Sequence, residues 1–260
     1  MAKEEPILGE TKWSEWRAVA AALLLVAACS PQSRETAAVA ANEPAAPCVR
    51  EWKRIANGAD YRMQGCSPAD LHLVRIDPKL FQLDAVMQPG ATAQSLAQAY
   101  PFVMNANFFD EQFRPLGVVM SNGKELNRPH PVSWQSVFLV TGDGTPRIVL
   151  VEEWKSVRDD ARMAVQCGPR LIVAGKPTDA REAPPSQRAG VCVTAEKQAL
   201  FFATPAGREL TVKETTALLS GLGCRDAMLF DGGHSVQLHL AGAVRLEGDD
   251  RVPAFVVGKP

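Results

Sequence analysis

The stretch Ala227–Leu240, AMLFDGGHSVQLHL, guides the interpretation of the whole chain. Its letters predict an apolar strand, a sharp polar turn at 231–235 and a second strand. Gly232 and Gly233 leave the backbone bare, so their N–H groups could line an anion-binding concavity. Asp231 would place a carboxylate beside that concavity. Taken alone, the same letters also fit a plain hairpin whose Asp-Gly simply makes the turn.

Apolar runs separated by tight turns predict strands through most of the chain. These runs are Leu71–Ile76, Leu80–Met87, Phe102–Met104, Leu116–Met120, Ser136–Val140, Pro146–Val151, Ala161–Gln166, Leu171–Val173, Ala189–Val193, Ala199–Ala203, Ala227–Phe230, Val236–Leu240 and Ala254–Val257. Two helices are predicted, Ala93–Ala99 behind the cap residue Thr92 and Val212–Leu222 behind a capping box that starts at Thr211. The sequence therefore predicts a single α+β domain, strand-rich, with a largely antiparallel or mixed sheet.

The composition is that of a globular protein. Hydrophobic residues make up 46% of the chain and charged residues 22%. The formal net charge of −1 gives no electrostatic reason to expect a nucleic-acid partner. A length of 260 residues allows one good-sized domain and leaves some chain for a tail.

Residues 1–29 are typical of a lipoprotein signal segment. The apolar run 18–28 is too short for an ordinary membrane helix, and VAAC at 26–29 resembles the bacterial lipobox, in which the cysteine carries the lipid. We therefore expect lipidation at Cys29 and a membrane attachment through that anchor. Ser30 resembles the signal for outer-membrane sorting, which places the expected domain in the bacterial envelope facing the periplasm. The acidic residues before the apolar run leave open a later start than Met1 or an uncleaved anchor.

The remaining chain divides into a tether and a folded domain. Residues 30–47 are rich in Ala, Pro and Ser and predict a disordered tether, and 48–260 form the expected domain. Export makes disulfides permissible in that domain, and its five cysteines leave at least one thiol free. Cys48 could pair with Cys66, and Cys167 and Cys192 sit on segments that could be neighbouring strands. No ligand spacing predicts a structural zinc site.

Four separate stretches carry the motifs of one family. They are MNANFFD at 104–110, QCGPRL at 166–171, the strand that begins at Arg188, and CRDAMLFDGG at 224–233. In this order they resemble the phosphodiester glycosidases over about residues 60–258. The chain departs from the family pattern where Ala106-Asn107 replaces Gly-Gly and where His234 replaces a third glycine. Both departures are expected to alter the pocket more than the fold.

The resemblance implies a hydrolase that cleaves the sugar–phosphate bond of a glycosyl-1-phosphodiester or a related envelope glycoconjugate. Cleavage at an anomeric carbon needs a carboxylate that stabilises positive charge, attacks or activates water. Asp231 is the first candidate for that catalytic role. His234 or Asp110 would assist the leaving oxygen or position water.

The substrate-binding candidates are polar groups and bare backbone. Arginine offers a planar pair of donors that suits the phosphate charge. The amide side chains would bind sugar hydroxyls or the phosphate, and the glycines would add N–H donors. The set is Asn105, Asn107, Gln166, Arg170, Arg188, Gly232, Gly233 and Ser235. No cofactor is required by the sequence, which leaves open a divalent cation near Asp231.

Two other functions compete with the hydrolase. The departures at Asn107 and His234 are compatible with a non-catalytic envelope module that binds a glycan or phosphoglycan. A purely structural lipoprotein would show Asn105, Gln166, Arg188 and Asp231 far apart. The three hypotheses therefore differ in whether these side chains meet.

Overall fold

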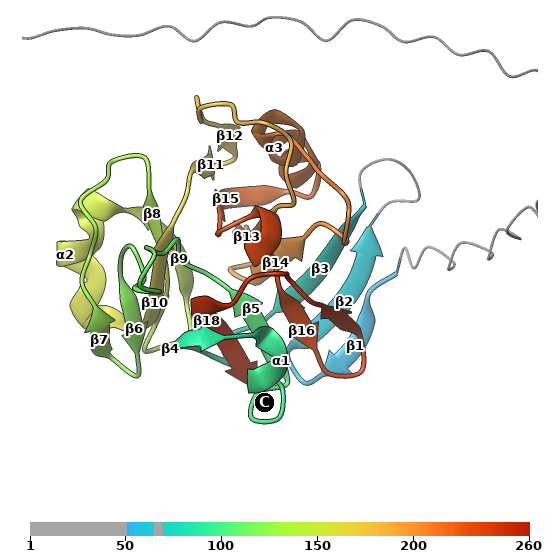
Figure 1. Ribbon diagram of the computed structural model, residues 1–260, viewed down its shortest axis with the longest axis horizontal. Coiled ribbons are helices and arrows are strands. Elements are labelled where there is room, and N and C mark those ends of the chain that lie inside the picture. The colour runs from blue at the N-terminus through green and yellow to red at the C-terminus, as the bar shows by residue number, and fades with distance from the viewer. Residues whose placement is uncertain (1–50, 65–69) are drawn as a thin grey trace, which may run out of the picture. The chain divides into compact units, whose positions relative to one another are not determined.

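The strands form three antiparallel sheets in the computed structural model, which describes residues 51–64 and 70–260 (Figure 1). The large sheet has the order β1-β2-β3-β14-β13-β15-β11-β12 and contains β1 (Lys53–Ala56), β2 (Ala59–Gln64), β3 (Leu71–Ile76), β11 (Arg170–Val173), β12 (Lys176–Pro177), β13 (Ala189–Thr194), β14 (Ala199–Ala203) and β15 (Cys224–Leu229).

Two five-stranded sheets accompany it. The β10 sheet has the order β7-β6-β10-β8-β9 and contains β6 (Val119–Ser121), β7 (Lys124–Asn127), β8 (Ser136–Thr141), β9 (Pro146–Leu150) and β10 (Ala161–Cys167). The β5 sheet has the order β17-β16-β5-β18-β4 and contains β4 (Gln82–Ala91), β5 (Phe102–Asn105), β16 (Leu238–Leu240), β17 (Val244–Leu246) and β18 (Val252–Lys259). The prediction of a strand-rich domain is confirmed. The strands form three sheets, whereas one sheet was expected from the sequence.

Helices are few and short among the described residues. They are α1 (Ala93–Leu96), α2 (Trp154–Val157) and α3 (Val212–Gly221), with the 3₁₀ turns η1 (Val151–Glu153), η2 (Arg158–Asp160) and η3 (Gly233–Ser235). The capping box at the start of α3 is confirmed, because the Thr211 side chain accepts from the Glu214 N–H and the Glu214 carboxylate accepts from the Thr211 N–H. No helix in the described part of the chain is long and apolar enough to cross a membrane.

One aromatic ring joins the three sheets at the core. Phe201 of β14 lies 4.8 Å from Phe102 of β5 and 5.7 Å from Phe138 of β8, measured between ring centroids, and all three are fully buried. Phe230, which follows β15, lies 6.4 Å from Phe201. Such aromatic contacts add to the burial of large apolar side chains. Strands of all three sheets are therefore held against one another close to the residue that precedes Asp231.

The turn at 231–237 corrects the hairpin interpretation. β15 pairs with β11 and β13 in the large sheet, whereas β16 pairs with β5 and β17 in the β5 sheet. The two strands are not partners, because the turn carries the chain from one sheet to the other (Figure 1). In a simple hairpin the two flanking strands hold the turn by pairing with each other. Because β15 and β16 do not pair, this turn must be held by contacts with other segments.

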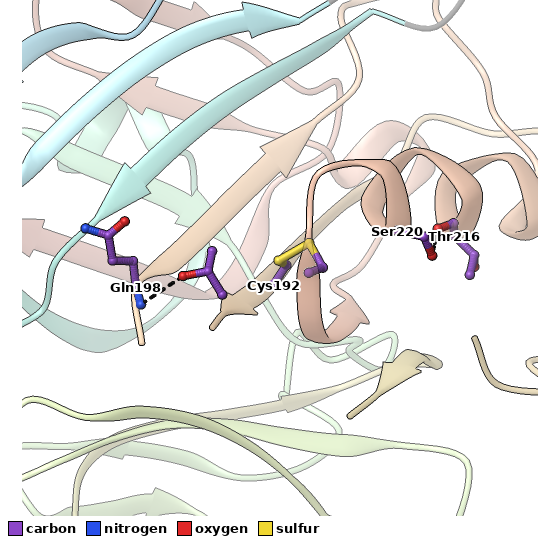
Figure 2. The surroundings of a disulfide bond; sticks show 6 residues. Cys192, Gln198, Thr216 and Ser220 are labelled. Carbon is purple, nitrogen blue, oxygen red and sulfur yellow. Dashed lines mark hydrogen bonds between the residues drawn. A yellow bond between two sulfur atoms is a disulfide. The ribbon is translucent and has the colours of Figure 1, made fainter. Parts of the chain in front are cut away.

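The disulfide prediction within the described residues is wrong. Cys192 pairs with Cys224, with their Cα atoms 5.7 Å apart, and Cys167 is a buried free thiol. Figure 2 shows this bond near α3, the helix that carries Thr216 and Ser220. The bond closes a loop with a sequence separation of 32, which contributes roughly 3–4 kcal/mol in the chain-entropy account. Cys29, Cys48 and Cys66 lie outside the described residues, as do the expected signal segment at 1–29 and the expected tether at 30–47.

Candidate active site

Asp231 lies where one strand from each sheet ends. It follows β15 of the large sheet, and its amide donates to the carbonyl of Ala106, directly after β5, at 2.9 Å. The thiol of Cys167, the last residue of β10, is close enough to Asp231 for the carboxylate charge to raise the pKa of that thiol. Three of the four sequence motifs therefore converge on one carboxyl group.

The carboxyl group of Asp231 is poised near neutral pH. Burial raises its pKa from 3.8 to about 6, and the negative charge of Asp250 acts in the same direction. Hydrogen bonds from the Ser235 side chain and the Gly232 N–H partly oppose the increase by stabilising the carboxylate. Ser235 is itself buried. A carboxyl group with such a pKa changes its protonation state in the range where enzymes use acids and bases.

The buried thiol beside Asp231 remains protonated. Burial raises the pKa of Cys167, although its sulfur accepts hydrogen bonds from the N–H groups of Gly168 and Phe108. The backbone of Phe108 is thereby fixed beside the carboxyl group. Cys167 thus forms a neutral wall of the site.

The two asparagines of the 104–110 motif have different roles. Asn105 is fully buried, donates from Nδ2 to the carbonyl of Asp231 at 2.7 Å and accepts at Oδ1 from the N–H of Gln237 at 3.0 Å. It therefore holds both ends of the turn that carries Asp231. Asn107 donates from Nδ2 to the carbonyl of Val118 at 3.0 Å, and its buried Oδ1 has no hydrogen-bond partner within the described structure. A buried unpaired acceptor costs roughly 1–3 kcal/mol, so Asn107 Oδ1 is suited to a hydroxyl group or water that enters the site.

The N–H groups of Gly232 and Gly233, predicted to line an anion-binding concavity, already have partners within the protein. The N–H of Gly233 donates to the carbonyl of Gln187 at 2.9 Å, and the N–H of Gly232 donates to the Asp231 carboxylate. Bare backbone is nevertheless needed here, because a Cβ on Gly232 would lie 2.7 Å from the Gln187 carbonyl oxygen. Gly233 has a φ of +61°, which favours glycine. The glycines therefore seat the turn against residue 187.

Gln166 holds a loop in place and has no group left for a substrate. Its Oε1 accepts from the N–H groups of Val118 and His130, and its Nε2 donates to the carbonyl of His130 and to Oε1 of Gln135. These four bonds use the full capacity of the amide. The predicted contact with a sugar is replaced by a positioning role for the loop 128–135.

Both arginines are engaged away from the Asp231 carboxylate. Arg170 donates from Nη2 to Asp226 at 2.9 Å and to the carbonyl of Ile148 at 3.1 Å. Arg188 is buried and donates from Nε to the carbonyl of Leu210 and from Nη2 to that of Pro184, each at 2.8 Å. Burial lowers the pKa of Arg188. Neither prediction of a phosphate contact is supported by these partners, and Arg188 instead anchors the loop 178–187.

Asp110 closes its own turn and is not suited to proton donation. Its carboxylate accepts from the N–H of Gln112, and from both the N–H and Nε of Arg114, the last at 2.7 Å. These bonds, with that to the Arg114 N–H the largest, hold the pKa of Asp110 below its usual value. A group that stays ionised at neutral pH does not act as a general acid there, so of the two predicted roles of Asp110 only the positioning of water is compatible with this pKa.

His234 lies on the exposed side of the turn. Its carbonyl accepts from the N–H of Asp250 at 3.2 Å, which brings that carboxylate into the neighbourhood of Asp231. Sequence reasoning missed Asp250, because the acidic run at 247–250 reads as an ordinary polar loop. It also missed Gln187, whose carbonyl accepts from the N–H of Gly233 and which carries no motif.

The described residues 51–64 and 70–260 contain no group of three or more His, Cys, Asp and Glu side chains placed to hold a metal ion.

Comparison with known proteins identifies a family for this chain. The phosphodiester glycosidase family matches residues 99–256, which is more than half of the 260-residue chain. None of the curated proteins matches. The catalytic domain of zebrafish N-acetylglucosamine-1-phosphodiester alpha-N-acetylglucosaminidase, auto-inhibited by its pro-peptide, has a similar fold, with a TM-score of 0.63 at 14% identity over 78% of this chain and 81% of that one.

A hypothetical protein from Synechocystis has a similar fold as well. Its TM-score is 0.61 at 14% identity over 77% of this chain, which spans only 62% of the Synechocystis protein. Identities this low establish the likeness of the folds alone.

Proposed function

Because this chain belongs to the phosphodiester glycosidase family, we propose that it is a glycosidase-type hydrolase that cleaves the sugar–phosphate bond of a glycosyl-1-phosphodiester. The observation that supports this proposal best is the Asp231 carboxyl group, partly buried where strands of three sheets end, with a pKa of about 6. An acid at such a position is a candidate functional group on physical grounds alone.

The Asp231 carboxylate would act on the anomeric carbon. Glycoside cleavage passes through a transition state with positive charge on the sugar ring, which a nearby carboxylate stabilises by charge or by attack. A phosphate ester leaves readily as an anion, so a strong general acid is not required at the leaving oxygen. The fixed turn, held by Asn105 and by Gly233 against Gln187, keeps the carboxylate oriented without reorganisation.

The ionised form of Asp231 should be required for turnover. Burial raises the pKa of Asp231 to about 6. We therefore expect kcat/KM to rise about tenfold per pH unit below pH 6 and to level off above it. Replacing Asp250 with Asn removes a negative charge that raises this pKa, so the acidic limb should move to lower pH. A flat profile between pH 5 and pH 8, or a rate that falls as pH rises through 6, would contradict the assigned ionisation.

A panel of defined esters tests the activity itself. Methyl N-acetylglucosaminyl-1-phosphate and its glucosyl and galactosyl counterparts would be incubated with the protein, and the products identified by chromatography. The proposal expects free sugar and a methyl phosphate from at least one member. The alternative, a non-catalytic glycan-binding module, draws on the engagement of Arg170 and Arg188 with other protein groups. Calorimetric binding of the panel with no product would favour that module.

We also propose that the domain is exported and lipid-anchored in the bacterial envelope, on the outer membrane facing the periplasm. The support is the lipobox-like VAAC at 26–29 with Ser30 behind it. Cells fed a radiolabelled fatty acid should label the protein, and a Cys29→Ser variant should remain unlabelled. Equal labelling of the two proteins would refute the anchor.

A further inference from the structure

An apolar groove opens on the surface between two loops. It has a volume of about 840 Å³ and is lined by the segment 178–184, by Ser133 and Trp134, and by Leu150, Pro169, Arg170 and Val173. Three large hydrophobic side chains lie exposed in its lining, Trp134 at 51%, Leu150 at 39% and Val173 at 38%. Apolar side chains gathered in a concave surface are a frequent mark of a ligand site.

Several polar residues of the lining use their polar atoms elsewhere. The Thr178 hydroxyl donates to the carbonyl of Arg170 at 2.6 Å, and the Arg170 guanidinium pairs with Asp226. The Glu182 carboxylate accepts from the N–H groups of Val212 and Lys213 at the start of α3. These polar groups are largely engaged within the fold, although Arg170 Nε is buried without a partner in the described structure. The rest of the lining presents hydrocarbon, the Trp134 ring and the charged residues Asp179 and Arg181.

Both walls of the groove continue to the Asp231 turn. The Trp134 ring lies 5.9 Å from the Phe108 ring between centroids, and the Phe108 N–H contacts the Cys167 thiol beside Asp231. The opposite wall runs on into Gln187, whose carbonyl accepts from the N–H of Gly233. The groove therefore adjoins residues that contact the Asp231 turn.

The walls are also held rigidly. Gln166 fixes the loop that carries Trp134 through its bonds to His130 and Gln135, and Arg188 fixes the other loop through the Pro184 carbonyl. A preformed groove avoids the entropy cost of ordering its walls when a ligand binds. The buried Gln166 and Arg188 therefore have the same structural role, since each holds a loop that lines the groove.

We propose that this groove binds the alcohol part of the phosphodiester, and that this alcohol is a hydrocarbon chain. This inference rests on the proposed function, because the groove is assigned to part of the substrate of that hydrolase. A sugar alcohol would present hydroxyl groups on every side, and the engaged polar groups of the lining would leave several of them unpaired. A hydrocarbon chain loses no hydrogen bonds there and gains from leaving water.

A series of chain lengths measures this preference. N-acetylglucosaminyl-1-phosphate would be esterified with methyl, butyl and octyl alcohols, and with the 6-hydroxyl of a hexose as the polar comparison. A buried methylene is worth up to about fourfold, and an open groove should give about twofold per methylene, so kcat/KM should rise about 100-fold from methyl to octyl. The hexose ester should react more slowly than the octyl ester.

Two leucines provide a matched pair of variants. Leu150 lies in the groove lining, whereas Leu80 is exposed at 51% outside that lining. Leu150→Ala should lower the octyl-to-methyl ratio at least about fivefold, and Leu80→Ala should leave it unchanged. Val173→Thr keeps the shape of the side chain while adding a hydroxyl group, and should lower the ratio in the same direction.

The outcomes separate the groove from the activity. Hydrolysis with equal kcat/KM for methyl and octyl esters, or with the hexose ester fastest, overturns the hydrocarbon assignment and leaves the hydrolase standing. If no ester is hydrolysed, the proposed function fails, and binding of octyl phosphate is then measured by calorimetry. Binding weakened by Leu150→Ala and not by Leu80→Ala supports the groove, and absence of binding overturns it.

Discussion

An Asp231→Asn variant should lose on the order of 10³ in kcat and become more heat-stable at pH 8. The activity falls because the neutral amide can neither stabilise the positive charge of the sugar ring nor attack it, and a positioned acid or base group typically supplies 10² to 10⁴. The amide has nearly the same shape, so the turn held by Asn105 should persist. Steady-state kinetics on the best ester of the panel measures the loss.

The gain in stability follows from the raised pKa of Asp231. Its folded pKa of about 6 exceeds the ordinary 3.8, so the charged form is disfavoured in the fold. The cost is absent below pH 3.8, grows between the two pKa values and is fully present above pH 6. The difference corresponds to roughly 3 kcal/mol at most, and the weaker hydrogen bonds of an amide reduce the gain to about 1–2 kcal/mol. The Tm should rise by several degrees at pH 8 and by almost nothing near pH 4.

Asp110→Asn is the matched control, since it makes the same chemical change in the neighbouring motif. The pKa of Asp110 is lowered, so its charge is favoured in the fold, and removing it should decrease the Tm slightly at pH 8. Its activity should stay close to that of the parent protein. Full activity in Asp231→Asn, or a Tm change of the same sign in both variants at pH 8, would contradict the roles given to the two carboxylates.

A Gly232→Ala variant should lose about 10² in kcat and about 1–3 kcal/mol of stability. Its φ of −110° suits any residue, so backbone strain is not the reason. The added Cβ would lie 2.7 Å from the Gln187 carbonyl oxygen, and one of the two backbone segments would have to move. Movement of the turn displaces the adjacent Asp231 carboxylate, and small displacements of a catalytic group are expensive.

Gly142→Ala isolates the steric effect. Gly142 likewise has no positive φ, and a Cβ at that position meets nothing within 4 Å. Its kcat and unfolding free energy should match those of the parent protein within error. The steric account fails if both alanine variants behave alike in kinetics and in denaturant unfolding.

The sequence predicted correctly those elements that are specified by neighbouring residues. The capping box at Thr211 predicts the start of α3, and the turn at 141–144 predicts the pairing of β8 with β9. These elements are specified by residues a few positions apart. Likewise, the order of four motifs predicts the family, which the match over residues 99–256 confirms.

Several candidate site residues have partners far away in the chain. Arg170 is neutralised by Asp226, 56 positions later, and the Gly233 N–H is taken by Gln187, 46 positions earlier. No periodicity or spacing encodes such pairs. For the same reason the sequence did not predict that β15 and β16 belong to different sheets, or that Cys192 would pair with Cys224.

Hydrolysis in ¹⁸O-labelled water is the most direct way to determine which bond of the phosphodiester is cleaved. The products of the most reactive ester would be analysed by mass spectrometry. Cleavage between sugar and phosphate at Asp231 requires the label in the C1 hydroxyl of the released sugar and none in the phosphate. Label in the phosphate instead would mean that the phosphorus–oxygen bond is cleaved, and the proposed glycosidase role of Asp231 would be abandoned.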